Sequence, residues 1–425
     1  MPNKRFEFFF LISISILTLL SFFLGFVYDE NSAGGGPNDS EHIWTNLQVF
    51  LTNDIRAAIT HDDYFDGRSP AAYILHKYLN PFASDYLLYR KSVFALSLLL
   101  PLLLIITLKK KFFLEKKELL IFLGSIVFIS PYFRTTSYWG IQENYGLFFL
   151  ISSFLSILIY KEIEEINKKR FLFIFFICLF SSLSFYFDQK LLIIPILSFL
   201  FILNNSSIYQ KIFSVTCYTI FSLPYLYFIY LWGGIIPTRQ LERSLTFDFE
   251  NIGYTITIIA FYVFPFFILK KDCYSLIKKK FFKKEYFSLF AVSLIYVLLF
   301  FLNYETTNKH IYGGGISYKL ATFFFNDLYF QKIFLSFSIL ISSLIIIFYF
   351  SIAHDRLIFL YFILLSLIIT PIYQEYYDPL IFIMLLTFFK ESIKFTFKNV
   401  IFLFCYFLIL LTASNFYYIL NPFEL

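Results

Sequence analysis

The sequence predicts an all-α polytopic membrane protein, a transmembrane helical bundle of about 11–13 spans with its N-terminus inside. Hydrophobic residues make up 59% of the 425 residues and charged residues only 15%, whereas about a quarter of the residues of a soluble domain are charged. Apolar runs recur along the whole chain, and Lys and Arg collect in alternate loops between them. This composition excludes a soluble enzyme, a disordered protein and a disulfide scaffold.

Thirteen apolar segments, some of them short, are the predicted spans, because a helix needs about 17–25 such residues to cross a bilayer. They are roughly 6–28, 91–108, 118–133, 144–160, 171–187, 191–203, 212–232, 253–269, 287–302, 333–353, 357–373, 379–389 and 399–420.

The basic residues predict the orientation. If Lys4 and Arg5 lie in the cytoplasm, the alternate loops that share their side hold most of the 35 Lys and Arg residues, with the richest runs at 109–117 and 270–286. The net charge of +6 is therefore a topology signal and does not indicate a nucleic-acid partner. An odd number of spans places the C-terminus outside.

The first span is a retained anchor or a cleaved signal peptide, and its length and the lack of a small-residue cleavage site favour the anchor.

The outer segment 29–90 is the longest loop of this arrangement and carries nine acidic residues and three of the five histidines. Long loops without secondary structure are uncommon in compact folds and are often functional. We expect one helix to open at residues 38–40, with Ile43, Leu47, Phe50, Leu51 and Ile55 on one apolar side, and to lie along the membrane surface. Ser69-Pro70 predicts the N-terminus of a second surface helix. We expect one domain over 1–425, with 29–90 as its outer part.

Further polar residues gather on the same predicted side of the membrane. Ionisable residues at span ends are costly without a partner or a role, which makes them site candidates, although each is also compatible with an ordinary solvated loop. They lie in segments 134–144, 187–190, 239–243, 309–315 and 373–379.

Acidic and basic groups at an outer, membrane-level cavity suit a lipid-phosphate substrate. A carboxylate can accept the proton of an acceptor hydroxyl as general base, and Arg or Lys can offset the charge on a phosphate leaving group. These groups favour glycosyl transfer from a polyprenyl-phosphate sugar donor to a lipid, glycan or protein acceptor. Such donors lie in the outer leaflet, so the active site would face outward from a cytoplasmic membrane.

The arrangement resembles the GT-C superfamily of integral-membrane glycosyltransferases. The resemblance is architectural over the whole chain and patchy in motif. The stretch 38–44 (NDSEHIW) matches the region after the first span where the superfamily carries its catalytic Asp or Glu, and 65–73 (FDGRSPAAY) is similar to a second acidic motif. Asp188-Gln189 and Tyr376-Tyr377 resemble weaker polar motifs of the dolichyl-phosphate-glucose-dependent glucosyltransferases.

Three acidic residues are the catalytic candidates. Asp39 is the first choice for the general base, and its structural alternative is a helix N-cap. Glu41 is the second, against a surface charge. Asp66 is expected to orient the acceptor or a metal, against a plain turn residue. Asp62, Asp63 and Asp66 offer oxygen ligands for a divalent cation, but this spacing is common by chance and no metal or other cofactor is assigned.

Eight residues are the substrate-binding candidates. The basic ones are expected to hold phosphate, with snorkelling to the lipid headgroups as the alternative. The histidine lies one helical turn from Asp39, where it can hydrogen-bond that residue or the sugar, or serve the structure. The eight are His42, Arg68, Tyr73, Lys190, Arg239, Arg243, Gln374 and Tyr377.

Two rival functions stay open. A secondary transporter would use a similar set of spans, but such proteins tend to show internal repeats and midplane charges, and neither is visible here. A polysaccharide polymerase or ligase of the cell envelope would use the same lipid-linked substrates, but typically has its large outer loop late in the chain.

Overall fold

The computed structural model describes residues 4–112, 117–164, 168–235, 237, 247–270, 278, 283–304, 313–369, 371–391 and 393–421. The described residues form helices joined by turns and contain no strand. The all-α prediction is thus confirmed for this part of the chain.

Nine helices among the described residues are long and apolar enough to cross a membrane, and each coincides with one of the thirteen predicted segments. They are Lys4–Val27, Tyr86–Phe112, Glu143–Glu162, Lys169–Phe187, Ile208–Trp232, Glu250–Leu269, Lys284–Asn303, Leu328–Tyr349 and Phe397–Leu420.

The other four predicted segments form shorter or broken helices. The segment 118–133 is a pair of helices bent by 68°, because Pro131 follows an extended Ser130 and starts a new helix. The segment 191–203 lies in a 17-residue apolar stretch, Gln189–Asn205. The segments 357–373 and 379–389 form helices of 14 and 7 residues.

The chain folds into two compact units. Unit 1 comprises Met1–Leu241 and Phe407–Leu425 and contains the whole outer segment. Its elements are α1 (Lys4–Val27), α2 (Gly36–Thr52), α3 (Ile55–Thr60), α4 (Ala71–Leu79), α5 (Tyr86–Ser97), α6 (Leu99–Phe112), α7 (Lys117–Ser125), η1 (Ile126–Ile129), α8 (Pro131–Tyr138), α9 (Glu143–Glu162), α10 (Lys169–Phe187), η2 (Gln189–Leu192), α11 (Ile193–Asn205), α12 (Ile208–Trp232) and the end of α21 (Phe397–Leu420).

Unit 2 comprises Glu242–Tyr406. Within it α18 packs against both α14 and α16, and α17 packs against α14 and α18. Its elements are α14 (Glu250–Leu269), α16 (Lys284–Asn303), α17 (Gly315–Phe324), α18 (Leu328–Tyr349), α19 (Ala353–Ser366), η4 (Gln374–Tyr376), α20 (Leu380–Leu386) and the start of α21.

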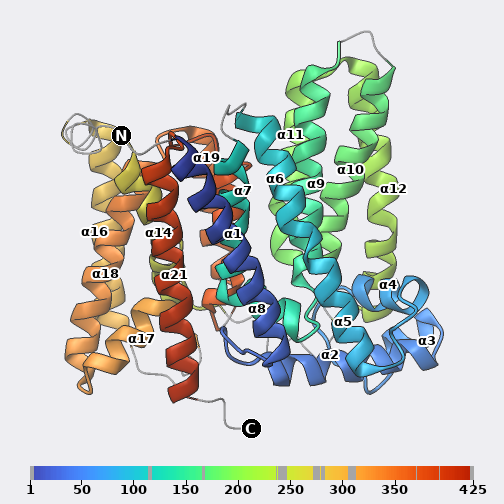
Figure 1. The fold of residues 1–425 in the computed structure, drawn as a ribbon, viewed down its shortest axis with the longest axis horizontal. Helices are drawn as coiled ribbons and strands as arrows, with labels where there is room; N and C mark the ends of the chain where they lie inside the picture. The colour runs from blue at the N-terminus through green and yellow to red at the C-terminus, as the bar shows by residue number, and fades with distance from the viewer. Residues whose placement is uncertain are drawn as a thin grey trace. The chain divides into compact units, whose positions relative to one another are not determined.

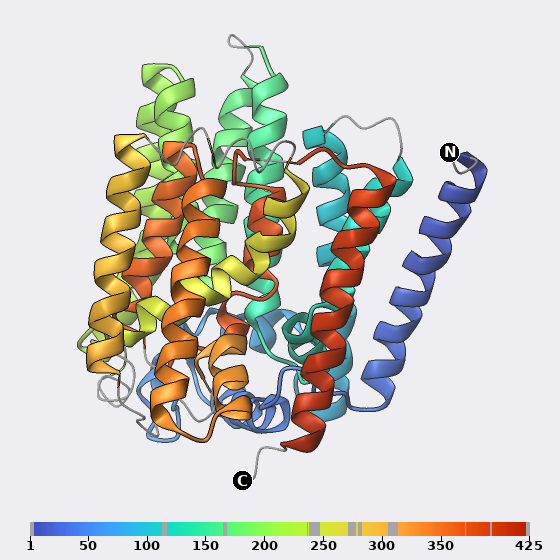
Figure 2. The same ribbon diagram turned by 90° about the vertical axis from the view of Figure 1, so that its left-hand side faces the viewer.

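The outer segment folds into short helices at one end of unit 1. In Figures 1 and 2 α2, α3 and α4 lie at the end of this unit opposite the N-terminus, and α2 runs across the direction of the long helices. Lys77 on α4 donates hydrogen bonds to the carbonyls of Phe50 and Asn53 and so caps the C-terminal end of α2. The predicted surface helices therefore form one assembly.

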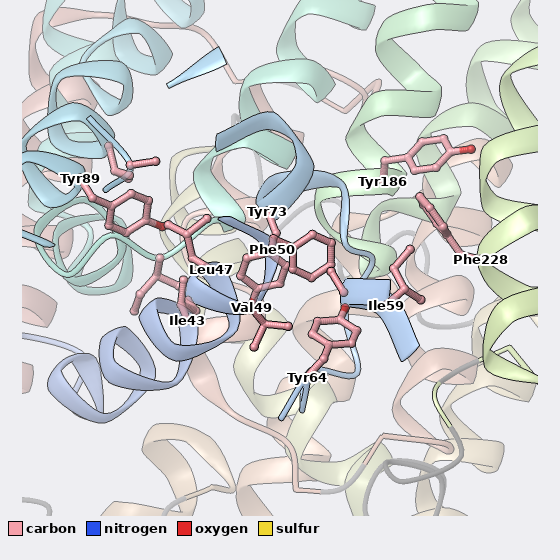
Figure 3. Packing of buried hydrophobic residues seen from close by; sticks show 14 of the residues in the cluster. Ile43, Leu47, Val49, Phe50, Ile59, Tyr64, Tyr73, Tyr89, Tyr186 and Phe228 are labelled. Carbon is pink, nitrogen blue, oxygen red and sulfur yellow. The ribbon is translucent and has the colours of Figure 1, made fainter. Parts of the chain in front are cut away.

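An apolar cluster fixes this assembly to the long helices (Figure 3). As the apolar pattern predicts, Ile43, Leu47 and Phe50 of α2 are buried. Phe50 stacks on Tyr73 of α4 with ring centroids 5.2 Å apart, and Phe228 of α12 belongs to the same cluster. Burying each large apolar side chain stabilises the arrangement by about 1.5–3 kcal/mol.

The helices α9 and α10 pack along one another and carry polar groups at both ends. Gly146 permits the close approach near one end, because a Cβ there would lie 2.9 Å from the Cβ of Asp188. This contact brings the start of α9 beside the residue that follows α10, next to the outer segment.

Candidate functional site

Asp39 lies inside the first turn of α2. The helix begins at Gly36, because Gly35 takes a left-handed conformation with φ of 71° and occupies the N-cap position. The N-cap alternative for Asp39 is therefore wrong. Among the described residues the Asp39 carboxylate has no hydrogen-bond partner, so it is free to bind a proton or a ligand.

The loop between α3 and α4 is held over α2 by an amide. Asn46, buried on α2, accepts a hydrogen bond from the Phe65 backbone N–H at 2.8 Å and donates to the His42 carbonyl at 2.8 Å. This bridge fixes the next residue, Asp66, close to the helix that carries Asp39.

Asp66 organises the loop around it. Its Oδ2 accepts a hydrogen bond from the Tyr73 hydroxyl at 2.5 Å, and its Oδ1 accepts one from the Arg68 backbone N–H at 2.9 Å. The carboxylate is buried and both oxygens are engaged by the protein. Asp66 and Tyr73 thus position Arg68. Asp66 holds the turn through the Arg68 N–H, and it also binds the Tyr73 hydroxyl, which a plain turn residue would not do.

The Arg68 guanidinium pairs with the first residue of α9. Its Nη2 lies 3.0 Å from Oε1 of Glu143, whose side chain is only 8% exposed, while the Arg68 side chain is 41% exposed. The buried Oε2 of Glu143 has no hydrogen-bond partner among the described residues, and buried polar atoms of this kind need an explanation. Arg68 therefore keeps an accessible face beside an unsatisfied carboxylate oxygen.

These charges act on Asp39. Burial raises the pKa of the Asp39 carboxyl to about 6, the Arg68 cation opposes the rise, and the negative charges of Glu143 and Asp66 add to it. A carboxylate with a pKa near the working pH is suited to proton transfer. Asp39 is thus a carboxyl group that takes up and releases a proton near pH 6.

Asp188 and Lys190 extend the cluster. Burial raises the pKa of the Asp188 carboxyl, the Lys190 cation lowers it, and Glu143 raises it. The Lys190 Nζ lies 3.5 Å from Oδ2 of Asp188. Lys190 is thus a partner of a carboxylate in this field, in addition to its predicted role at phosphate.

Glu41 and His42 lie on the exposed side of α2. The His42 Nε2 lies 3.3 Å from the Asn46 amide, and its ring meets Phe65 edge-on at 6.3 Å. The structural alternative for His42 is therefore favoured over a hydrogen bond to Asp39. The exposure of Glu41 likewise favours the surface-charge alternative.

Two further arginines near the site are used by the fold. Arg134 forms a buried ion pair with Glu30, with its Nε 2.9 Å from Oε1, and also donates to the carbonyls of Phe128 and Ser21. Arg90 pairs with Asp29 at 2.5 Å. Arg134 thus neither snorkels to the headgroups nor stays free for phosphate.

The remaining candidates belong to unit 2 or lie outside the described residues. Gln374 and Tyr377 belong to unit 2, where Gln374 donates to the Tyr262 hydroxyl at 3.1 Å and the buried Tyr377 hydroxyl lies 3.0 Å from that of Thr255. Gln374 also lines a cavity of about 250 Å³ in that unit. Arg239 and Arg243 lie outside the described residues.

No group of three or more His, Cys, Asp or Glu side chains among the described residues is arranged to hold a metal ion. The charged residues of the cluster in unit 1 are four carboxylates, one arginine and one lysine: Asp39, Asp66, Glu143, Asp188, Arg68 and Lys190.

Sequence reasoning named Asp39, Asp66, Arg68, Tyr73 and Lys190, and the structure brings these five together at one end of unit 1. Glu143 and Asp188 stand at the ends of predicted spans, where a charged residue is costly without a partner, and this signal marked their segments, 134–144 and 187–190, as site candidates without giving either residue a role. Asn46 was not named, because a buried amide on an amphipathic helix has no comparable signal.

No family model matches the chain, and no curated protein or solved structure is significantly similar to it. The class of the protein, an all-helical chain with many helices able to cross a membrane, therefore rests on its sequence and structure.

Proposed function

We propose that this protein is a membrane glycosyltransferase of the GT-C type that moves one sugar from a polyprenyl-phosphate donor to an acceptor hydroxyl on the outer face of the cytoplasmic membrane. The observation that carries the proposal is Asp39, a carboxylate without a protein hydrogen bond among the described residues and with a pKa of about 6. It stands beside Arg68, which is partly exposed and held by Glu143.

The reaction follows from these groups. Asp39 accepts the proton of the acceptor hydroxyl, whose oxygen forms a bond to the anomeric carbon of the sugar. The bond from that carbon to the phosphate oxygen breaks, and polyprenyl phosphate leaves with the electron pair. Arg68 offsets the negative charge that develops on the phosphate. The unsatisfied Oε2 of Glu143 accepts a hydrogen bond from a sugar hydroxyl.

The test is transfer of a radiolabelled sugar from polyprenyl-phosphate donors in proteoliposomes. We expect wild type to transfer the sugar and Asp39→Asn to lose about 10²–10⁴-fold in rate, the usual range for a general base. Glu41→Gln is the matched control, because Glu41 lies two residues away on the exposed side of α2, and we expect it to keep wild-type activity.

Two outcomes would change the proposal. Full activity in Asp39→Asn would remove Asp39 as the base and leave the reaction class standing. No transfer from any donor by the folded wild type would reject the reaction class, and transport assays for the secondary-transporter alternative would follow.

A further inference from the structure

A polar cavity of about 480 Å³ lies in unit 1 at the opposite ends of α9 and α10 from the site described above. It is lined by Tyr160 and Lys161 near the end of α9, by Arg170 at the start of α10, and by residues 204–207 at the junction of α11 and α12. Figure 1 shows these ends of α9, α10 and α12 far from α2 and α4. Glu143 and Tyr160 are 17 residues apart on one helix, so the two sites are separated by about 25 Å.

Neither cation of the cavity has a carboxylate partner among the described residues. No acidic residue is among the described residues that line the cavity, and neither Lys161 nor Arg170 forms an ion pair with another residue that the structure describes. Nearby Glu162 pairs with Lys110 instead. Two positive charges that face one cavity repel each other, and an anion between them would relieve that repulsion.

The arginine is fixed in place, although no described carboxylate pairs with it. The Arg170 side chain is buried, its Nε donates to the Ile163 carbonyl at 2.9 Å, and its guanidinium lies 4.7 Å from the centre of the Tyr160 ring. The Nη groups have no hydrogen-bond partner among the described residues. The Arg170 guanidinium is held by the hydrogen bond from its Nε and by the Tyr160 ring. Its remaining N–H groups can therefore bind an oxyanion.

The opposite wall is polar and ordered. The Tyr160 hydroxyl lies 2.6 Å from the Ser206 hydroxyl and donates to Oε1 of Gln210 at 3.2 Å. Gln210 also accepts a hydrogen bond from the Ser207 N–H at 3.1 Å and so caps the start of α12. The positive end of the dipole of α12 adds to the field of the two cations.

We infer that this cavity binds a phosphate group, the headgroup phosphate of an anionic phospholipid. The cavity lies where three helices able to cross a membrane, α9, α10 and α12, end or begin, which is the level of the lipid headgroups. Its volume suits a small polar ligand. Lys and Arg near a membrane surface attract anionic lipids in this way.

The test measures lipids that stay bound to the purified full chain in detergent, by native mass spectrometry. We expect phosphatidylglycerol to be retained in preference to phosphatidylcholine. Lys161→Gln and Arg170→Gln should each weaken phosphatidylglycerol binding about fivefold, since each Lys or Arg near the surface contributes about 1 kcal/mol. Lys168→Gln is the matched control, because Lys168 is exposed at the N-cap position of α10, two residues before Arg170, and does not line the cavity.

Three further results complete the test. Arg170→Lys keeps the charge and should retain most of the binding if Arg170→Gln fails to fold. Displacement of phosphatidylglycerol by millimolar inorganic phosphate would assign the phosphate site to the free ion, and persistence would assign it to the lipid. Equal retention of phosphatidylglycerol by wild type and Lys161→Gln, or equal retention of phosphatidylcholine and phosphatidylglycerol without displacement by phosphate, would overturn the inference.

Discussion

The two ends of the α9–α10 pair carry opposite electrostatic environments. At one end Glu143 and Asp188 join the carboxylates of the outer segment around Arg68. At the other end Lys161 and Arg170 line a cavity with no carboxylate among its described lining residues. One end thus holds anions that the protein partly neutralises, and the other holds cations without a described anionic partner.

The helix dipole accounts for half of this pattern. On α9 the acidic Glu143 stands at the N-terminus and the basic Lys161 in the last turn, where each is stabilised by about 0.3–1 kcal/mol. On α10 the order is reversed, because Arg170 stands in the first turn and Asp188 follows the last. Charges set against a dipole need other contacts, and both residues have them.

The two ends of the α9–α10 pair are therefore built in different ways. The α2 end depends on a packed apolar cluster that seats a separate segment on the long helices, so its charges are set by tertiary contacts. The opposite end is built from residues close in sequence to the two helix junctions. The variants below test this difference, beginning with the largest expected effect.

Phe50→Ala should destabilise the protein by about 3–5 kcal/mol, because it removes a fully buried ring from the centre of the cluster under α2. Thermal unfolding in detergent measures the loss. Leu79→Ala is the control, because the Leu79 side chain is 75% exposed on α4. Equal melting temperatures for the two variants would show that the outer segment does not depend on this packing.

Asp39→Asn should stabilise the protein at neutral pH while it abolishes the proposed activity. The pKa of Asp39 is raised from 3.8 to about 6, so its ionised form costs at most about 3 kcal/mol above pH 6, and this cost disappears as the pH falls towards 4. Melting temperatures at pH 7.5 and 4.5 measure the effect. A variant that is less stable than wild type at pH 7.5 would contradict the burial of an unpaired charge.

Lys77→Gln should cost about 2 kcal/mol, because the cation donates to two carbonyls at the end of α2. Lys91→Gln on α5 is the control, since Lys91 is exposed and no contact of it is described. Thermal unfolding distinguishes them. If both variants melt like wild type, the cap contributes nothing and α2 is held by its apolar side alone.

Glu143→Gln tests the electrostatic environment of Asp39 at the α2 end. Removing its negative charge lowers the pKa of Asp39, so the acidic limb of the pH profile of kcat/KM should move below pH 6. The loss of the ion pair to Arg68 should raise KM for the donor about tenfold, a cost of about 1.4 kcal/mol. An unchanged limb together with an unchanged KM would separate Glu143 from the site.

The local sequence pattern was sufficient to predict the helices. It did not predict which side chains from distant parts of the chain pair with one another. Ile43, Leu47 and Phe50 identified the buried side of α2 because helical periodicity depends on neighbours three and four residues apart. The N-cap prediction for Asp39 failed because Gly35 starts the helix earlier. The pairing of Arg134 with Glu30, 104 residues away, has no local signal.

Composition and span length are enough to predict a helical chain that is apolar enough to cross a membrane many times, because both depend only on what each segment contains. The sequence also shows that acidic residues collect in the segment 29–90. Which of those residues share one electrostatic field follows from the tertiary packing. The pKa of Asp39 depends on burial and on Arg68, Glu143 and Asp66, which reach it only after the segment has packed onto α9 and α10.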